Sequence, residues 1–486
     1  MVEICNLVGG RWVAARGDDW IERHNPADVG EVVVRFPAME APDVELVMDE
    51  AGTGFKTWRQ VGMLERATLL ADAAAILRSR ADDVATDITR EMGKTITESS
   101  AEVAASIAFL EHYAGLARVA QGDVLADRRT DVHTSTRREP LGVVALITPW
   151  NDPLLTPTRK LAPALLAGNS IVLKPALETP LAALHLVSAL FDAGVPPGVV
   201  NVVTGRPDAI APTLLEHPNL AAVSFTGSTA VGLELGRRLG GRTVRLQTEM
   251  GGKNAVLVLP DADLDAAAQA IVAAGCGQAG QRCTATSRIV VHADVHDELV
   301  GRIVQRVEQL VLGPGTTAGT QMGPLVSEEH LTAVLSAVDK ARGEGASVVT
   351  GGERATGPAL DRGWFMKPAV LTGVGQDSGI WQDEVFGPVL VVAPVDSFAE
   401  GVSAVNASRY GLAAGVFTRD LAAGHRFADA VDVGQVVVNL PTSGWDVHVP
   451  FGGFRDSGSA FKEHGIEGLR FYTRVKSVAV GYGTQG

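Results

Sequence analysis

Apolar positions near the start of the chain follow a helical spacing. From Glu65 to Thr97 they recur every three or four residues, which predicts one long amphipathic helix that Gly93 ends. A second helix is expected from about Glu102 to Ala117. The expected inner face of the first helix consists of Leu69, Leu70, Ala73, Ile76 and Leu77.

Between residues 142 and 252, short apolar runs alternate with helical patterns. Such an alternation is typical of a parallel sheet covered on both faces, and these sheets bind ligands at the carboxyl ends of their strands. The expected strands cover residues 142–147, 170–174, 199–203 and 221–225, and the expected helices cover residues 180–193 and 209–217.

The alternation begins again after Gly252, which indicates a second α/β domain. A strand at 255–259, a helix at 264–274 and a strand at 287–291 are expected. Two polar stretches, Asp123 to Pro140 and Phe471 to Val480, fit neither core. We expect both to form exposed β arms.

Length, charge and cysteine content indicate how many domains to expect, which partners are disfavoured and in which compartment the protein is expected. The chain has 486 residues, which at roughly 150 residues per domain predicts two to four domains. A net charge of −14 argues against nucleic acid as a partner. No apolar run approaches the roughly 20 residues that span a bilayer, and residues 1–13 lack the pattern of a secretory signal. Three cysteines are too few for a disulfide framework, so a cytoplasmic protein is expected.

Cys283 is a candidate nucleophile because glycines near it leave room for a substrate. A thiol attacks carbonyl groups as the thiolate, which positive or dipolar surroundings favour. Considered alone, a cysteine in an apolar segment is more often a small packed residue. We expect Cys276 to be such a residue at a helix end, and no cysteine or histidine motif has the spacing of a metal site.

Two polar residues follow predicted strands. Glu249 stands at a strand end before a glycine-rich turn, where a carboxylate facing a cleft can act as a general base. Its other interpretation is a helix cap or a solvated turn carboxylate. Asn151 follows the strand at 142–147, and its amide can stabilise an oxyanion. Alone, a Trp-Asn pair after a strand would more often be a loop.

Glycines at 227 and 232 stand between a predicted strand and a predicted helix. Backbone N–H groups at the start of that helix can hold a pyrophosphate. The spacing Gly-x-x-x-x-Gly is not the dinucleotide fingerprint and is a weak signal in isolation.

Taken together, several ordered motifs resemble the aldehyde dehydrogenase superfamily over nearly the whole chain, from Asn25 to Thr473. The motifs are Pro-Trp-Asn at 149–151, Phe-Thr-Gly-Ser at 225–228, Glu-Met-Gly-Gly-Lys at 249–253, Gly-Gln-Arg-Cys at 280–283, Glu-Val-Phe-Gly-Pro at 384–388 and Pro-Phe-Gly-Gly at 450–453.

The resemblance implies an α/β fold with a Rossmann-type dinucleotide-binding domain, a second α/β catalytic domain and a small β oligomerisation arm. The expected boundaries are 1–122 and 141–252 for the dinucleotide domain, 253–450 for the catalytic domain, and 123–140 and 451–486 for the arm and tail. Members of the superfamily form dimers or tetramers through this arm, so a homodimer or homotetramer is expected.

The resemblance also implies roles for single residues. Cys283 matches the nucleophile, Glu249 the base and Asn151 the oxyanion donor. For the cofactor, Lys174 matches the lysine at the adenine ribose, Trp150 and Ser228 line the dinucleotide with Gly227 and Gly232, Glu384 binds the nicotinamide ribose and Phe386 packs near the nicotinamide.

The implied cofactor is NAD or NADP, and we expect dual use. NAD-selective members carry an acid three residues after the lysine that matches Lys174, and this chain has Leu177 there. A leucine cannot repel a 2′-phosphate as an acid does. The alternative is that Glu178 takes over that role and NAD dominates.

The expected substrate is a short aliphatic aldehyde with a distal carboxylate. Arg159, placed in the first turn of a helix that Pro157 begins, resembles the carboxylate-binding arginine of succinate-semialdehyde dehydrogenases. The segments 281–288 and 439–444 resemble 2-oxoglutarate-semialdehyde dehydrogenases. Arg159 could instead only pair with Asp152 or another surface acid, and exposed pairs of that kind contribute little.

Other activities stay open at this point. Trp445 would suit an aromatic aldehyde. A coenzyme A-acylating enzyme and a catalytically silent scaffold are further alternatives, which the retention of Glu249 and of Cys283 argues against. His330 matches a position near the cofactor in the superfamily, but we expect it to be a solvated helix residue. Asp152 stands where the superfamily usually has phenylalanine.

Overall fold

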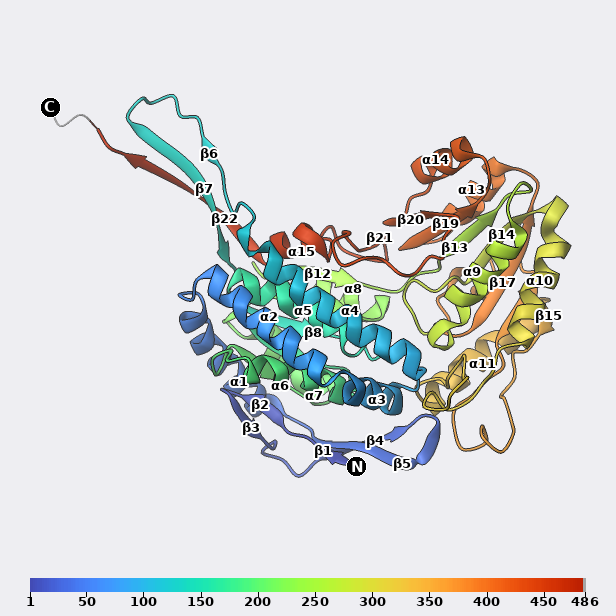
Figure 1. Cartoon of the computed structure of the whole chain (residues 1–486), viewed down its shortest axis with the longest axis horizontal. Coiled ribbons are helices and arrows are strands. Elements are labelled where there is room, and N and C mark those ends of the chain that lie inside the picture. Colours follow the sequence, from blue (N-terminus) through green and yellow to red (C-terminus); the bar gives the residue numbers. More distant parts are fainter. Residues whose placement is uncertain (484–486) are drawn as a thin grey trace.

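The computed structural model describes residues 1–483, which form two lobes and a projecting arm (Figure 1). The first lobe is built on a seven-stranded sheet. Its strands, in spatial order, are β12 (Arg245–Glu249), β11 (Leu220–Thr226), β8 (Val143–Ile147), β9 (Ser170–Lys174), β10 (Val200–Val202), β2 (Asn6–Val8) and β3 (Arg11–Val13). Neighbouring strands from β12 to β10 pair in parallel. β2 pairs antiparallel with both of its neighbours, β10 and β3.

Helices cover both faces of this sheet, as the alternation of strands and helices predicts. One face packs against α1 (Ala41–Trp58), α7 (Pro207–Glu216) and α8 (Thr229–Leu239). The other packs against α2 (Met63–Ser79), α4 (Ile96–Gly115), α5 (Leu155–Ala167) and α6 (Pro180–Asp192). Because both faces are covered, every residue of β9 is buried.

The single helix expected from Glu65 to Thr97 is wrong in one respect, because it is two helices. After α2 ends, the backbone of Arg80 leaves the helical conformation, and α3 (Ala81–Met92) begins. The turn at Arg80 lets α3 pack its own apolar face against α4 and α6. Gly93, in the left-handed conformation with φ of 96°, ends α3 as predicted.

The second lobe is built on another seven-stranded sheet. Its strands, in spatial order, are β15 (Ser347–Thr350), β16 (Ala369–Thr372), β17 (Val389–Val395), β14 (Arg288–His292), β13 (Ala255–Val258), β19 (Ala413–Phe417) and β20 (Gln435–Val438). The helices of this lobe are α9 (Leu264–Cys276), α10 (His296–Glu308), α11 (Glu328–Gly343), α12 (Gly379–Gln382), α13 (Phe398–Asn406) and α14 (Leu421–Ala430).

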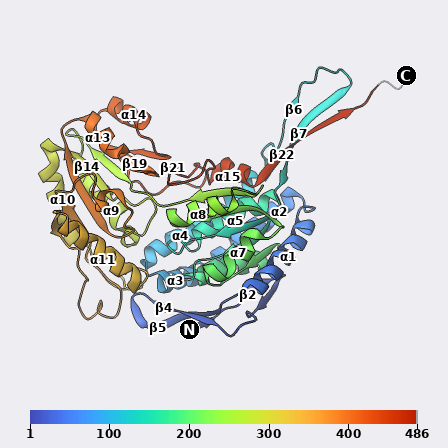
Figure 2. The ribbon, with the colours of Figure 1, turned by 180° about the vertical axis from the view of Figure 1, so that it is seen from behind.

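The two polar stretches pair with each other to form the arm. In it, β7 (Val132–Pro140) lies antiparallel between β6 (Val124–Leu125) and β22 (Thr473–Gly481). The arm projects away from both lobes in the two opposite views (Figures 1 and 2). β6 and β22 are largely exposed, whereas β7, which lies between them, is mostly half-buried.

Smaller elements complete the described part of the chain. A three-stranded sheet joins β1 (Val2–Glu3), β5 (Asp28–Pro37) and β4 (Trp20–Asn25), and β18 (Tyr410–Gly411) pairs with β21 (Phe454–Arg455). The remaining helices are α15 (Gly465–Phe471) and the short 3₁₀ turns η1 (Leu116–Arg118), η2 (Gly277–Gly280) and η3 (Ala293–Val295). Within residues 1–483, no helix is long and apolar enough to cross a bilayer.

Candidate active site

Two cavities meet at Cys283. The first, of about 250 Å³, is lined by residues that follow the carboxyl ends of β8, β11 and β12, including Asn151, Ser228 and Met250. The second, of about 500 Å³, lies along α4 and is walled on another side by the loop that carries Trp445. Cys283, Asp152 and Arg159 line both cavities. The nucleophile candidate is therefore open to two separate approaches.

The backbone before Cys283 has an unusual conformation. Gln278, Ala279 and Gly280 are all left-handed, with φ of 51°, 54° and 69°. Gly280 must be glycine here, because a Cβ would lie 2.3 Å from the backbone of Gly387. This run carries the chain from the end of α9 into the segment of Cys283.

The Cys283 thiol is a weak acid in this environment. Burial raises its pKa to about 12. The charge of Arg159 lowers the pKa, whereas the charges of Asp152, Glu249 and Glu384 raise it. Without a change in these surroundings, the side chain holds its proton at neutral pH. Cys276, the last residue of α9, is buried as expected.

Asn151 is buried beside the cysteine segment. Its Nδ2 donates to the carbonyl oxygen of Gln281, at 3.0 Å. A side-chain amide carries two hydrogens, so a second donor remains for another acceptor. The side chain also lines the first cavity together with Cys283.

Glu249, the last residue of β12, is only 2% exposed. Among the described residues, neither of its carboxylate oxygens has a hydrogen-bond partner. Burial, and then the charge of Glu463, raise its pKa well above the ordinary value, while nearby Arg159 and Lys160 oppose the rise. The carboxyl packs against Gly452 and contributes to the wall of neither cavity.

Of the candidate cofactor residues, Trp150, Gly227, Ser228, Glu384 and Phe386 line the first cavity. Lys174, Leu177 and Gly232 do not. Lys174 ends β9, is 9% exposed and donates to the carbonyl oxygen of Pro175.

The two glycines of the Gly-x-x-x-x-Gly segment have packing roles. A Cβ on Gly227 would lie 2.6 Å from the ring of Phe225, and one on Gly232 would lie 2.3 Å from the sulfur of Met250. The hydroxyl of Ser228 caps α8, accepting from the backbone N–H of Val231. The start of α8 therefore lies close against the strand ends.

Glu384 reaches across to the turn after β12. Its Oε1 accepts from the backbone N–H of Gly252 at 3.0 Å, and a Cβ on Gly251 would lie 1.9 Å from its Oε2. Burial raises the pKa of Glu384 to about 7, although that hydrogen bond lowers it.

His330 is not the solvated residue expected from the sequence. It lies in the first turn of α11 but is half-buried, and its Nε2 lies 2.8 Å from the carbonyl oxygen of Phe386. Its ring packs edge-on against Trp150 and Phe386, with centroids 5.4 and 6.1 Å away. The expectation failed because the strand-end residues that bury His330 are distant in sequence. Only its alignment with the superfamily could have indicated this place.

Arg159 lies in the second turn of α5, not the first, because the helix begins at Leu155. It is 6% exposed and pairs with Glu463, with Nε 2.8 Å from the carboxylate. Lys160 pairs with the same carboxylate. The guanidinium also lies over the ring of Phe451, 5.2 Å from its centroid. The partner of Arg159 is thus a buried acid and not Asp152.

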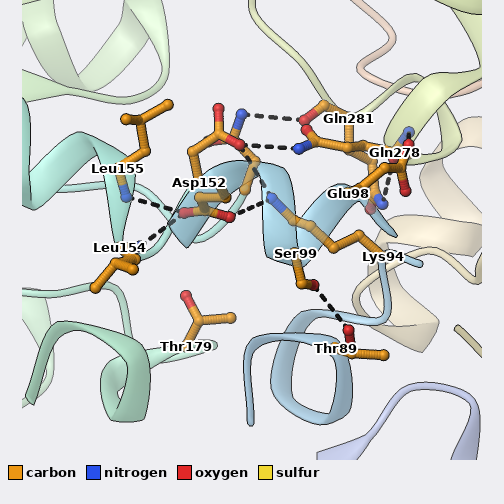
Figure 3. Close-up of polar contacts among 12 residues, drawn as sticks. Thr89, Lys94, Glu98, Ser99, Asp152, Leu154, Leu155, Thr179, Gln278 and Gln281 are labelled. Atoms are coloured by element: carbon orange, nitrogen blue, oxygen red, sulfur yellow. Dashed lines mark hydrogen bonds and ion pairs between the residues drawn. The ribbon is translucent and has the colours of Figure 1, made fainter. Parts of the chain in front are cut away.

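Asp152 lies in a second buried group of charges (Figure 3). Its Oδ1 accepts from Lys94 Nζ at 3.0 Å and from Gln278 Nε2 at 2.9 Å. Lys94 also pairs with Glu102 at 2.7 Å. Within residues 1–483 there is no cluster of three or more acidic, histidine or cysteine side chains that could hold a metal ion.

Comparisons with known proteins agree with this geometry. Residues 12–478 match the model of the aldehyde dehydrogenase family. The chain is 41% identical to an alpha-ketoglutarate semialdehyde dehydrogenase of Haloferax volcanii, over 98% of this chain and 99% of that protein. It is 39% identical to a phenylacetaldehyde dehydrogenase of Pseudomonas fluorescens, over 98% and 95%. A crystal structure of betaine aldehyde dehydrogenase from Staphylococcus aureus, in complex with NAD⁺, superposes with a TM-score of 0.96 at 31% identity, covering 99% of this chain and 95% of that one. The chain belongs to the aldehyde dehydrogenase family.

Proposed function

We propose that this NAD(P)-dependent aldehyde dehydrogenase attacks its substrate with Cys283, holds the oxyanion with Asn151 and activates water with Glu249. The observation that carries the proposal is the position of Cys283 at the meeting point of two cavities. One cavity can hold the reacting end of a cofactor and the other can admit an aldehyde. Asn151 lines the first cavity and retains a free amide hydrogen.

The residues of the first cavity fit a nicotinamide dinucleotide. The N-terminus of α8, which Ser228 caps at the N–H of Val231, suits a pyrophosphate, and the rings of Trp150 and Phe386 offer an apolar wall for a flat ring. The carboxyl of Glu384 offers an acceptor for ribose hydroxyls. Family members bind NAD, and we propose that this chain also accepts NADP, because Leu177 carries no charge that would repel a 2′-phosphate.

The reaction at Cys283 begins when its thiol loses its proton to a base, and the resulting thiolate adds to the aldehyde carbon, which forms a carbon–sulfur bond and an oxyanion. The amide of Asn151 and the backbone N–H of Cys283 donate to that oxyanion. A bound nicotinamide dinucleotide supplies the hydride acceptor that turns the thiohemiacetal on Cys283 into a thioester. Glu249 then accepts a proton from water, the oxygen adds to the thioester carbon, and Cys283 departs as a thiolate with release of the acid.

We propose a short aliphatic semialdehyde with a distal carboxylate as the substrate. Two buried cations, Arg159 and Lys160, share the single carboxylate of Glu463, so Glu463 alone does not neutralise both of them. Arg159 lines the second cavity, where the distal end of an aldehyde would lie. A guanidinium can bind such a carboxylate through two parallel hydrogen bonds. The relative from Haloferax volcanii bears the name of an enzyme for such a semialdehyde.

An aromatic aldehyde is the second candidate. Trp445 and Phe451 line the second cavity, and Trp445 Nε1 is already used in a bond to the carbonyl oxygen of Thr442. The ring of Trp445 could then face a substrate ring, whereas Arg159 already lies over the ring of Phe451. The relative named for phenylacetaldehyde is consistent with this candidate.

One assay series tests these proposals together. Initial rates are measured for succinate semialdehyde, butanal and phenylacetaldehyde, each with NAD and with NADP. We expect the highest kcat/KM for the semialdehyde and measurable turnover with both cofactors. A preference for phenylacetaldehyde would favour the aromatic candidate, and absence of NADP binding would end the dual-cofactor proposal. Cys283→Ala should abolish turnover, with Cys276→Ala as the matched control that retains it.

The arm, the domain boundaries and the compartment also belong to this proposal. Exposed strand edges such as β6 invite pairing with another copy of the chain. We therefore propose a homodimer or homotetramer joined through the arm, which sedimentation at micromolar concentration tests. We propose that the dinucleotide-binding domain consists of residues 1–122 and 141–252. The catalytic domain would consist of residues 253–450, and the arm and tail of residues 123–140 and 451–486. A cytoplasmic location fits the free state of Cys5, Cys276 and Cys283.

A further inference from the structure

We infer that Asp152 is a positioning residue: one of its carboxylate oxygens holds Gln278, and through it the strained segment that carries Cys283, against the segment that carries Asn151. The inference rests on the roles proposed above for Cys283 and Asn151.

The strained backbone before Cys283 must be stabilised by contacts with surrounding groups. Gln278 and Ala279 are not glycine, yet both are left-handed, a conformation that costs about 1–3 kcal/mol for each such residue. Both are almost fully buried, so solvent supplies none of the missing stabilisation. Surrounding groups must therefore fix the run, since a relaxed run would displace Cys283.

The contacts of Gln278 supply that restraint. Its backbone N–H donates to Glu98 Oε1 at 2.7 Å, and its side-chain Nε2 donates to Asp152 Oδ1 at 2.9 Å. Its carbonyl oxygen accepts from the backbone N–H of Gln281 at 3.1 Å. Each polar group that anchors Gln278 therefore points in a different direction, which fixes the residue in orientation as well as in place.

These bonds form a closed circuit, of which Figure 3 shows the contact between Asp152 and Gln278. The side chain of Asn151 donates to the carbonyl oxygen of Gln281, and Gln281 is bonded to Gln278, which donates to Asp152. Because Asn151 and Asp152 are consecutive, two neighbouring side chains hold the nucleophile segment at two points. The distance between the oxyanion donor and the thiol is set by this circuit.

Lys94 keeps the Asp152 carboxylate ionised and oriented. Its ammonium group is fully buried and lies between Asp152, at 3.0 Å, and Glu102, at 2.7 Å. Burial alone would raise the pKa of Asp152, but the charges of Lys94 and Arg282 outweigh burial and lower it. The other oxygen of Glu102 accepts from the first N–H groups of α5, at Leu154 and Leu155. The circuit is thereby anchored to the helix that carries Arg159.

A simpler interpretation makes Asp152 only a counter-charge for Lys94. The two interpretations differ in what an asparagine at 152 does. Its amide oxygen can still accept from Gln278 and from Lys94, but it carries no charge. A positioning role survives that change, and a counter-charge role does not. Gln278→Asn provides the converse, because it shortens the donor, tolerates the left-handed backbone and leaves the Lys94–Asp152 pair intact.

The test compares Asp152→Ala, Asp152→Asn, Gln278→Asn and the double variant Asp152→Ala with Gln278→Asn. Steady-state kinetics use butanal, which has no carboxylate, and the rate of Cys283 alkylation by iodoacetamide is followed across pH. We expect Asp152→Ala and Gln278→Asn each to lower kcat by about 10- to 100-fold with KM changed less than about threefold, because small misplacements of reacting groups cost rates of this size. We expect Asp152→Asn to keep kcat within about threefold of wild type, and the double variant to be no slower than the slower single variant.

The inference is overturned if Asp152→Ala keeps wild-type kcat, if Gln278→Asn does, or if Asp152→Asn is as slow as Asp152→Ala. Thermal unfolding of each variant identifies any that fails to fold. If Asp152→Ala does fail, Gln278→Asn and Asp152→Asn decide the question. The nucleophile assignment is tested separately by Cys283→Ala. Retained turnover there would overturn the proposed mechanism, whereas wild-type kinetics of Asp152→Ala would overturn only this inference.

Discussion

Gly452 leaves the space that the carboxyl of Glu249 occupies. A Cβ on Gly452 would lie 2.3 Å from Glu249 Oε1, and the glycine has φ of 149°, a conformation that other residues rarely adopt. The Pro-Phe-Gly-Gly segment at 450–453 therefore has a direct physical connection to the proposed base.

Gly452→Ala should consequently act on the hydrolytic half of the reaction. The added methyl overlaps the Glu249 carboxyl and also strains the backbone, at a cost of about 1–3 kcal/mol. We expect a lower melting temperature and slower steady-state turnover, with a burst of reduced cofactor in stopped-flow traces. Gly481→Ala, at an arm glycine whose Cβ would meet no atom within 4 Å, is the matched control. Wild-type turnover by Gly452→Ala would contradict the contact.

Glu249→Gln should separate the two halves of the reaction more completely. An amide cannot accept the proton of water, so the thioester on Cys283 should accumulate after a burst equal to the concentration of sites. The raised pKa of Glu249 also predicts the direction in which the rate of hydrolysis changes with pH. Wild-type hydrolysis should increase with pH as this carboxyl loses its proton, over a range above that of an ordinary glutamate. The variant should lose that dependence, and wild-type steady-state rates in it would mean that another group is the base.

Arg159→Leu tests the recognition of a distal carboxylate. Hydrogen bonds to charged groups contribute roughly 1.5–3 kcal/mol each, so the loss of even one of them should lower kcat/KM for succinate semialdehyde by about 10- to 150-fold. For butanal the change should stay within about threefold. Lys160 remains to pair with Glu463, so the variant should fold, which circular dichroism checks. An equal loss for both aldehydes would show that Arg159 does not bind the carboxylate.

The stability of the first lobe should depend on pH through Glu91. Its carboxyl is 2% exposed and accepts from the backbone N–H groups of Leu181 and Ala182, at the start of α6. Burial raises its pKa to about 8, and those hydrogen bonds oppose the rise. A carboxyl whose pKa is higher in the folded state binds its proton more tightly there, so the stability it confers is full at low pH and falls as pH rises from about 4.5 to 8.

Glu91→Gln should flatten that part of the profile. The free energy of unfolding, measured with urea at pH 5 and pH 8, should fall less between the two values in the variant than in wild type. An exposed acid such as Glu298, changed to glutamine, serves as the control. If the two profiles have the same slope, Glu91 titrates normally.

Local sequence patterns predict the strands and helices well because the apolar spacing that favours each element lies within one continuous segment. The bounds of β9 agree with the predicted ones at both ends, and β7 and β22 form at the two polar stretches. The break at Arg80 escapes prediction because no proline or glycine marks it. The break allows α3 to pack against α4 and α6, which lie elsewhere in the chain.

In the site, too, features carried by local motifs were predicted, whereas contacts between residues distant in sequence were not. Cys283 and Asn151, to which the resemblance assigns catalytic roles, line one cavity, and those roles stay predictions. Partners distant in sequence were not found: Lys94 lies 58 positions before Asp152, and nothing local links them. His330 was assigned to solvent for the same reason. The roles of Glu249 and Lys174 in catalysis and cofactor binding stay predictions.

The pairing of Lys160 with Glu463 also has a consequence for synthesis on the ribosome. Glu463 is added 303 positions after Lys160. Until then, a nascent chain that packs α5 into its final place must bury two cations with no carboxylate opposite them, which is strongly unfavourable. We expect the first lobe to stay incompletely packed around α5 during elongation, so that the two lobes become committed to their native arrangement together, after Glu463 has left the exit tunnel.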